Sequence, residues 1–310
     1  MDGNKQELIS FIESLRKKFP TLGRRKIAEK VIEEKPGHFF YMRDGKKIRY
    51  TQNGVEKAMR ATFKKPNPIR ERPKLNIVSS TKLTPYLKGD PNNVLVIPDL
   101  HEPFSRDGII EHCREVQERY KCGTVVNIGD EVDLCALSVW EKDPDGLSAG
   151  SEYIEALKQM KNWYRVFPAC KIAIGNHSER MFRLARTAGI PKGMIKSYQE
   201  IWEAPSGWEW ATSWEINDVL YTHGTGSSGL KAAITRAMQV RQCVVIGHVH
   251  TEANIIYSAS SKDLIWAMMV GGAIDDKSYA AAYAKENVKK SIVGCGVVLG
   301  KLPIYIPMQL

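Results

Sequence analysis

The sequence lacks any apolar run long enough to cross a membrane. The longest candidate, residues Leu264 to Ile274, contains two glycines, and it is shorter than the roughly 18 to 20 residues that a spanning helix needs. The N-terminal residues also lack the apolar stretch and small-residue cleavage site of a secretory signal. We therefore expect a cytoplasmic protein that has no membrane partner.

Cysteine is scarce and scattered. The six cysteines form no C-x-x-C pair, and several lie in apolar runs, as Cys243 does. That distribution favours reduced thiols in a core over a disulfide framework or a cysteine-bound zinc ion. Internal repeats and low-complexity tracts are absent too. A length of 310 residues with 43% hydrophobic content then predicts a globular protein of one large and one small domain.

Acidic residues are few at one end of the chain. Residues 1–75 hold 20 Lys or Arg against 9 Asp or Glu, a net charge of +11, whereas the other 235 residues hold 25 against 26, a net charge of −1. A basic segment on a near-neutral body favours binding to a polyanion, because each neutralised phosphate releases counterions. The alternative is that these cations serve solubility. We expect nucleic acid to be the partner.

Residues 1–65 predict a small helical domain with a hairpin. Apolar residues recur at helical spacing after Asn4 and again over Arg24 to Glu34, and Asp44-Gly45 separates two β-prone runs as hairpin turns do. A further helix is expected over Asn53 to Phe63. This order resembles a helix-turn-helix with a wing. Its candidate nucleic-acid contacts are Arg24, Arg25, Lys26, Lys46 and Lys47.

The composition changes after the first domain. Residues 66–91 are rich in proline, which is typical of an extended linker. Over residues 92–310, short apolar runs alternate with helical patterns, which predicts a layered α/β domain. The last part, Asp263 to Met308, is β-prone and broken by glycines, and we expect it to form a second sheet packed on the first. The apolar runs expected to be buried strands are 94–97, 124–128, 171–174, 219–222 and 243–246.

Residues suited to bind metal follow each of these strands. Carboxylate, amide and imidazole side chains come directly after the apolar runs, and loops that leave one edge of a sheet converge in a single crevice. Alternate residues on an extended strand end face the same way, so two residues separated by one can reach the same ion. The candidates are Asp99, His101, Asp130, Asp133, Asn176, His177, His223, His248 and His250.

In chain order the motifs are D-x-H (99–101), GD-x-x-D (129–133), GNH (175–177), a single strand-end His and GH-x-H (247–250). This series resembles the calcineurin-like metallophosphoesterases over residues 92–310. The resemblance implies a four-layer α/β/β/α sandwich that holds two divalent ions. It also implies the ligand sets. Asp99, His101 and His250 would bind the first ion, Asn176, His223 and His248 would bind the second, and Asp130 would bridge the two.

The resemblance further implies the chemistry of the site. Oxygen and nitrogen ligands without thiolate suit Mn²⁺, which we favour, or Fe, Zn²⁺ or Ni²⁺. Two such ions would activate a bridging hydroxide as the nucleophile, with Asp130 between them. His177 would not bind metal but would protonate the leaving-group oxygen, because imidazole titrates near neutrality.

Several neighbouring residues are left with alternatives. We expect Asp133 to orient a ligand or its loop rather than to bind metal. Arg180 is either a contact for substrate phosphate or a surface residue at a helix start. The family often has an acidic residue where this chain has Ser178, which leaves the partner of His177 open. Four tryptophans either pack over a sheet, which we favour, or form a stacking wall for bases: Trp202, Trp208, Trp210 and Trp214.

The sequence therefore predicts a metal-dependent hydrolase of phosphodiester bonds, and the basic first domain favours nucleic acid as its substrate, as for a nuclease. One alternative is a phosphodiesterase or phosphatase that acts on small nucleotides or phosphoproteins and uses the first domain for targeting. Another is a binding module on an inactive scaffold, which the complete set of ligands disfavours.

Overall fold

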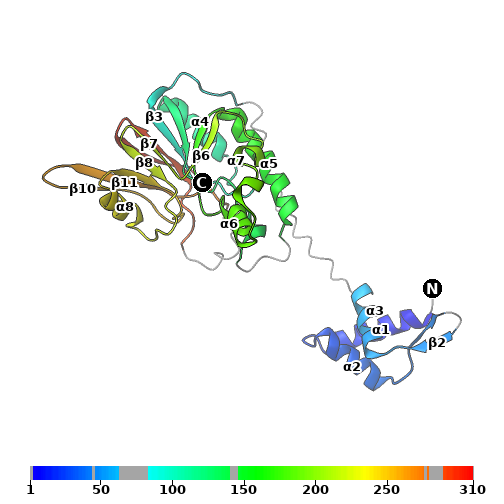
Figure 1. Ribbon diagram of the computed structural model, residues 1–310. Coiled ribbons are helices and arrows are strands. Elements are labelled where there is room, and N and C mark those ends of the chain that lie inside the picture. Colours follow the sequence, from blue (N-terminus) through cyan, green and yellow to red (C-terminus); the bar gives the residue numbers. More distant parts are fainter. Residues whose placement is uncertain are drawn as a thin grey trace. The chain divides into compact units, whose positions relative to one another are not determined.

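The computed structural model describes residues 3–43, 46–62, 83–139, 146–275, 278 and 289–309. The chain divides into two compact units, Met1–Lys74 and Leu75–Leu310, and each unit has an apolar core of its own. Figure 1 shows the elements of both units in the order of the sequence. Within the described ranges, no helix is long and apolar enough to cross a membrane.

The first unit packs helices and a two-stranded hairpin around its core. Ile27 and Val31 recur on one face of α2 and are buried, where they pack with Leu8 of α1 and Met59 of α3. The expected Asp44-Gly45 turn and most of the expected linker lie outside the described residues. The elements are α1 (Gly3–Lys18), α2 (Arg24–Glu34), β1 (Phe40–Arg43), β2 (Lys46–Arg49) and α3 (Gln52–Thr62).

The second unit is a mixed α/β structure, as predicted, and its described residues form two sheets. The six-stranded sheet has the strand order β13-β12-β3-β4-β5-β6. Strands β3 to β6 run parallel, and β12 is antiparallel to both β3 and β13. The strands are β3 (Asp90–Ile97), β4 (Cys122–Asn127), β5 (Cys170–Ala173), β6 (Trp208–Ala211), β12 (Gly294–Leu299) and β13 (Leu302–Pro307).

The five-stranded sheet has the order β10-β11-β9-β8-β7. Its central strands β8, β9 and β11 are parallel, and the hairpin partners β7 and β10 form its antiparallel edges. Parallel strands deliver their C-terminal ends to one edge of the sheet, and that edge carries the candidate ligands. The strands are β7 (Ser213–Ile216), β8 (Val219–Thr222), β9 (Cys243–Ile246), β10 (Ala253–Ala259) and β11 (Leu264–Val270).

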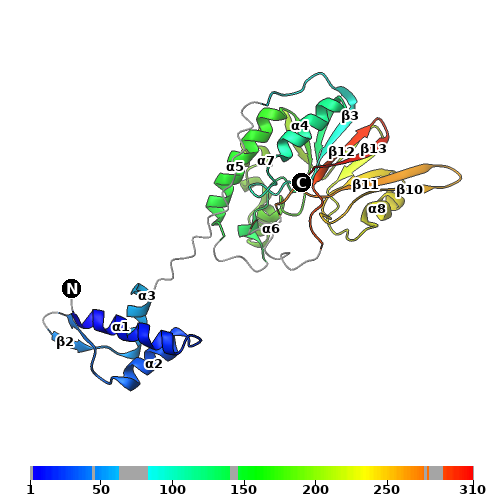
Figure 2. The same cartoon turned by 180° about the vertical axis from the view of Figure 1, so that it is seen from behind.

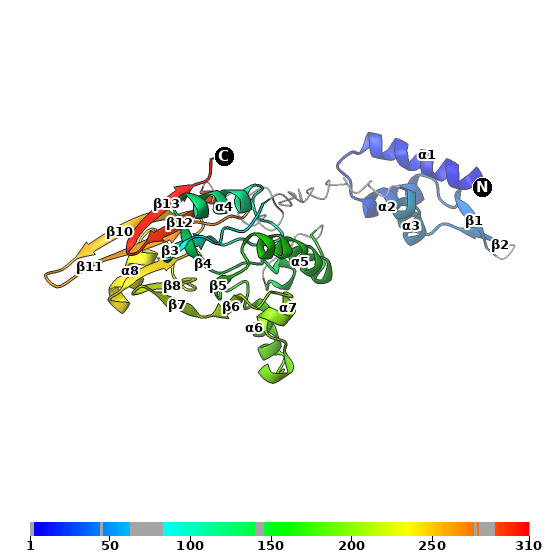
Figure 3. The same cartoon turned by 90° about the horizontal axis from the view of Figure 1, so that it is seen from above.

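The alternation of apolar residues along β3 explains how the sheets pack. Val94 and Val96 point into the core between the two sheets, whereas Leu95 and Ile97 point into the core beneath α4 (Ile109–Arg119) and α5 (Ala149–Val166). On the other sheet, α8 (Ala232–Val240) covers the outer face of β9 and β11 (Figure 3). The remaining helical segments are η2 (Cys135–Leu137), α6 (Arg180–Thr187), η3 (Lys192–Met194) and α7 (Tyr198–Ile201).

The expectation that the last part of the chain forms the second sheet is wrong. Among the described residues of this stretch, β11 belongs to the five-stranded sheet, whereas β12 and β13 extend the six-stranded sheet beside β3, as Figure 2 shows. The physical reason is burial on both faces of β12. Val297 packs under the helices and Val298 packs between the sheets, so this strand fits an interior position that hydrophobic patterning alone does not assign to a particular sheet.

The separate core of the first unit makes a testable prediction. Replacing buried Ile27 by alanine should lower the free energy of unfolding of residues 3–62 by about 2 to 5 kcal/mol, because the truncation leaves a cavity. Denaturant unfolding followed by circular dichroism should show that loss while the transition of the second unit stays in place. Lys26→Ala, at the exposed neighbouring position, is the control. Equal losses in the two variants would contradict the assignment of Ile27 to the core.

Candidate metal centre

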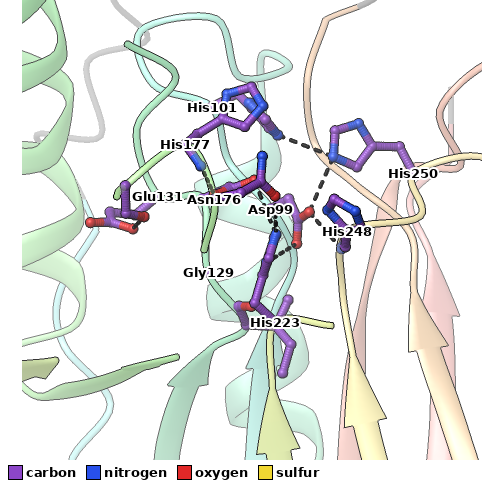
Figure 4. Close-up of polar contacts among 12 residues, drawn as sticks. Asp99, His101, Gly129, Glu131, Asn176, His177, His223, His248 and His250 are labelled. Carbon is purple, nitrogen blue, oxygen red and sulfur yellow. Dashed lines mark hydrogen bonds and ion pairs between the residues drawn. The ribbon is translucent and has the colours of Figure 1, made fainter. Parts of the chain in front are cut away.

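The structure brings together all seven side chains that were predicted as metal ligands. Each follows the C-terminal end of a parallel strand, β3, β4 and β5 in one sheet and β8 and β9 in the other. Figure 4 shows the side chains from both sheets pointing toward one another. In each of three groups of residues, the potential ligand atoms lie within 4.8 Å of one another. The groups are Asp99, His101 and His250; His101, Asp130 and His177; and Asp130, His223 and His248.

The first cluster is built on two converging imidazoles. The Nε2 atoms of His101 and His250 are 3.1 Å apart, and His250 Nε2 is also 3.1 Å from Asp99 Oδ2. At most one of two facing Nε2 atoms can donate a proton to the other, so the arrangement places lone pairs and a carboxylate around one point. Such a geometry suits a cation better than it suits hydrogen bonding among the three groups alone.

The second cluster centres on His223. Its Nε2 atom is 3.0 Å from Asn176 Oδ1 and 3.1 Å from Asp130 Oδ2. The Nδ1 atom is 3.0 Å from the carbonyl oxygen of Ile128. Because a carbonyl can only accept, Nδ1 carries the proton, and this hydrogen bond directs Nε2 toward the cluster as in metal-binding histidines. Asp130 belongs to groups on both sides, which places it between the two clusters.

The charge balance of the residues fits divalent cations. Asp99 is fully buried, and its Oδ1 atom has no hydrogen-bond partner among the described residues. A buried carboxylate oxygen without a partner is costly. Burial by itself lowers the pKa of His223, but Asp130 and Asp99 raise it to about 9. Without a bound cation, a proton on His223 therefore balances part of the negative charge of the carboxylates. A bound cation would balance that charge instead.

His177 lies beside the clusters and is held by Asp133. Its Nδ1 atom is 3.0 Å from both the carbonyl oxygen and Oδ1 of Asp133, and its backbone N–H donates to Asp130 Oδ1 at 2.7 Å. Asp133 thus supplies the partner that the sequence left open. Asp133 Oδ2 is also 3.5 Å from Nδ1 of His101, so one carboxylate lies beside imidazoles on two neighbouring loops.

Arg180 is neither a free surface residue nor an isolated cation. Its side chain is only 11% exposed, and NH1 donates to the carbonyl oxygen and Oδ1 of Asp133 at 2.8 and 3.0 Å. The NH2 atom is 3.1 Å from Nε2 of His177. Because a guanidinium can only donate, Nε2 accepts this hydrogen bond, and His177 in this arrangement carries its proton on Nδ1.

Two buried glutamates that sequence reasoning missed support the ligand loops. Glu131, next to Asp130, accepts from Ser178 Oγ at 2.5 Å and from Trp210 Nε1 at 2.9 Å. Glu102, next to His101, accepts from Trp163 Nε1 at 2.7 Å, and burial raises its pKa to about 7. The sequence signal that could have identified these glutamates is an acidic residue directly after a predicted metal ligand. That signal is weak, because acidic residues are common in turns.

The tryptophans between 202 and 214 serve mainly as packing. Trp202 and Trp208 are each 1% exposed and belong to the core beneath the helices. Trp214 is partly buried, and its indole N–H donates to the carbonyl oxygen of Ile172 at 2.9 Å. The favoured interpretation as a cover over the sheet is thus supported for these residues, and Trp210 additionally holds Glu131.

The five predicted nucleic-acid contacts lie in the first unit. Arg24, Arg25 and Lys26 form the first turn of α2 and are exposed, and Lys46 and Lys47 are exposed on β2. Arg25 also pairs with Glu29 at 3.5 Å. All five are therefore accessible to a partner.

Several solved structures are similar to this chain at low sequence identity. Vacuolar protein sorting 29 from Cryptosporidium parvum matches with 14% identity over 69% of this chain and 85% of that chain, at a TM-score of 0.33. Vps29 from Entamoeba histolytica matches with 10% identity over 70% and 99%, at 0.33. Nuclease MPE from Pseudomonas putida matches with 12% identity over 69% and 87%, at 0.27. With TM-scores this low, none of these likenesses bears on what this chain does.

No protein-family model matches the chain, and no curated protein sequence matches it.

The glycines that precede the ligands provide a test of the centre. A Cβ atom at Gly247 would overlap Oδ1 of Asp99, so Gly247→Ala should displace that carboxylate and weaken Mn²⁺ binding by about 10-fold or more. Titration calorimetry and metal analysis after dialysis would measure the change. Gly150→Ala is the matched control, because nothing lies within 4 Å of a Cβ there. Undiminished Mn²⁺ affinity in Gly247→Ala would refute the placement of a cation against Asp99.

Proposed function

We propose that this protein is a two-metal-dependent phosphoesterase that hydrolyses phosphodiester bonds and acts on nucleic acid. The observation that carries the proposal is the position of Asp130, which lies in one group with His101 and in another with His223 and His248. The helices outside each of the two sheets support the four-layer α/β/β/α sandwich implied by the motifs. The order of helices and hairpin in the first unit supports a winged-helix-like domain.

The seven clustered side chains divide into two ligand sets under this proposal. Asp99, His101 and His250 would hold one divalent ion, Asn176, His223 and His248 would hold the other, and Asp130 would serve both. Ions in such a site lower the pKa of bound water and neutralise charge on phosphoryl oxygens. The set of oxygen and nitrogen donors favours Mn²⁺ over Fe, Zn²⁺ and Ni²⁺ as the resident ion.

His177 is the residue that we assign to proton transfer. Asp133 fixes Nδ1 and thereby directs Nε2, and the protonated ring would donate from Nε2 to the leaving-group oxygen. A protonated Nε2 cannot accept the hydrogen bond from Arg180 that the structure shows. In the reacting complex, NH2 of Arg180 must therefore leave the ring while NH1 keeps its hydrogen bonds to Asp133, and the phosphoryl oxygens of a substrate are the acceptors that suit NH2 best.

The first unit supports nucleic acid as the substrate class. Its excess of positive charge is +11 over residues 1–75, and the cations at the start of α2 lie where a helix end already favours anions. A tethered basic unit raises the local concentration of a polyanionic substrate near the hydrolytic site. Small nucleotides or phosphoproteins would gain less from such a unit, which is why we rank them second.

The direct test is a substrate panel with Mn²⁺. We expect metal-dependent cleavage of DNA or RNA and turnover of bis-p-nitrophenyl phosphate, and His177→Ala should lower both by about 10²- to 10⁴-fold while the metal content stays near that of the unaltered protein. Product gels, absorbance assays and metal analysis provide the measurements.

Three other outcomes would count against parts of this assignment. Turnover of p-nitrophenyl phosphate alone would indicate a phosphatase, and absence of any turnover from a metal-replete protein would indicate a binding module. Loss of metal from His177→Ala would show that this histidine is a ligand.

A second prediction concerns the first unit. Deleting residues 1–74 should weaken binding to a DNA or RNA duplex and flatten its dependence on salt, because fewer counterions are released, while the metal content of the second unit is unchanged. Fluorescence anisotropy at several salt concentrations would measure both quantities. Equal affinity of the full chain and the deletion variant would remove the first unit from substrate binding.

A further inference from the structure

The segment between the GNH loop and β6 is a basic arm on the second unit. This arm, residues 180–201, contains α6, η3 and α7, and Figure 3 shows α6 standing out from the two sheets. Residues 181–199 include no Asp or Glu, and they carry four cations. These are Arg183, Arg186, Lys192 and Lys196.

The charge of the arm contrasts with that of the unit that carries it. Residues 76–310 have 25 Lys or Arg against 26 Asp or Glu; residues 180–201 hold five Lys or Arg and one Glu, so the rest of the unit holds 20 against 25, a net charge of −5. A positive segment on a negative body attracts a polyanion to one place. The arm is thus a favourable surface for a chain of phosphates among the described residues of this unit.

The cations of the arm are accessible. Arg183, Lys192 and Lys196 are exposed. The side chain of Arg186 is 68% exposed and is 3.5 Å from a carboxylate oxygen of Glu179, and such solvent-exposed ion pairs contribute little stability. A phosphate can therefore replace that partner at small cost.

Both ends of the arm are fastened to residues of the metal centre. At the start, the guanidinium of Arg180 is bonded to Asp133 and lies against His177. At the end, Tyr198 stacks on Trp210 with 6.0 Å between ring centroids and an interplanar angle of 8°, and Trp210 donates to Glu131. Arg180 is thus linked through Asp133 to His101, and Tyr198 is linked through Trp210 to Glu131, which directly follows Asp130.

The two halves of the arm also contact each other. The ring centroids of Phe182 in α6 and Tyr198 in α7 are 4.5 Å apart, so α6, which carries Arg183 and Arg186, is held to α7 as well as to the site. An arm fixed in this way presents its charges at a constant distance from the reacting phosphate. A charged loop that moves freely in solvent would not hold its charges at a constant distance from the site, so a fixed arm is better suited to guide a substrate.

We propose that this arm binds the backbone phosphates of a nucleic-acid strand on one side of the bond that is cut. The inference rests on the proposed function and adds the place where the strand runs. Phosphate contacts of this kind position a substrate without reading its sequence. The exposed apolar side chains of Ile190 and Met194 also suit an anionic membrane surface, but the fastening of the arm to catalytic residues favours the substrate.

The test removes two cations from the arm and two from elsewhere on the same unit. Arg183→Gln with Lys196→Gln changes the arm. Lys262→Gln with Lys301→Gln is the matched control, because these lysines lie in the β10–β11 and β12–β13 turns, at the sheet edge opposite to the metal centre. Both double variants alter exposed residues and change the net charge equally.

The measurements are kcat/KM for a labelled oligonucleotide over a range of NaCl concentrations and kcat/KM for bis-p-nitrophenyl phosphate, both with Mn²⁺. In the arm variant, the ratio of oligonucleotide to small-substrate kcat/KM should fall about 10-fold, and the salt slope for the oligonucleotide should decrease by roughly 0.7 to 0.9 for each phosphate contact that is lost. The control variant should keep both values.

Three results would overturn the inference. Unchanged ratio and slope in the arm variant, with the small diester still hydrolysed, would reject the arm while leaving the proposed function in place. Loss of binding to phosphatidylserine vesicles in the arm variant without any change for the oligonucleotide would assign the arm to a membrane surface. Failure of the unaltered protein to hydrolyse either substrate would reject the proposed function and this inference with it.

Discussion

Buried negative charge at the strand ends is the constraint on which the rest of the second unit depends. Asp99, Asp130 and Asp133 are each at most 3% exposed, and removing even one carboxylate from water costs several kcal/mol unless positive charge is close. Burial raises the pKa of Asp130, but His223 and His177 outweigh that effect, and its pKa lies well below the usual range. Asp130 is therefore ionised at neutral pH, and the site is organised around buried carboxylates whose charge a bound cation would offset.

The backbone and the packing around the site hold those anions in place. Gly175 and Gly247 lie so close to the carboxylates of Asp130 and Asp99 that any side chain would collide with them. Behind the same loops, Glu102 and Glu131 are each tied to an indole N–H, which connects the ligands to the aromatic core. Support of this kind keeps the carboxylates in position whether a protonated histidine or a bound cation balances their charge.

The sequence predicts well where the strands lie and which side chains gather at their ends, because the two signals reinforce each other. Each ligand follows an apolar run, and the runs 94–97, 219–222 and 243–246 coincide with the buried parts of β3, β8 and β9. Sheet membership was harder to predict, since β12 is apolar on both faces and periodicity does not say which strand lies beside it. The contacts of Glu131 with Ser178 and Trp210 were out of reach as well, because they join side chains that are 47 and 79 positions apart.

The candidate centre takes its ligands from two sheets. Asp99, His101, Asp130 and Asn176 follow strands of one sheet, and His223, His248 and His250 follow strands of the other. Elsewhere the sheets meet through apolar side chains such as Val96 and Tyr221. Ions bound at that junction would hold the two sheets together, since coordination by the folded state increases the free energy of unfolding. Loss of the ions would then lower the thermal stability of the protein as well as any catalytic activity. Chelation would weaken the contact between the two sheets first.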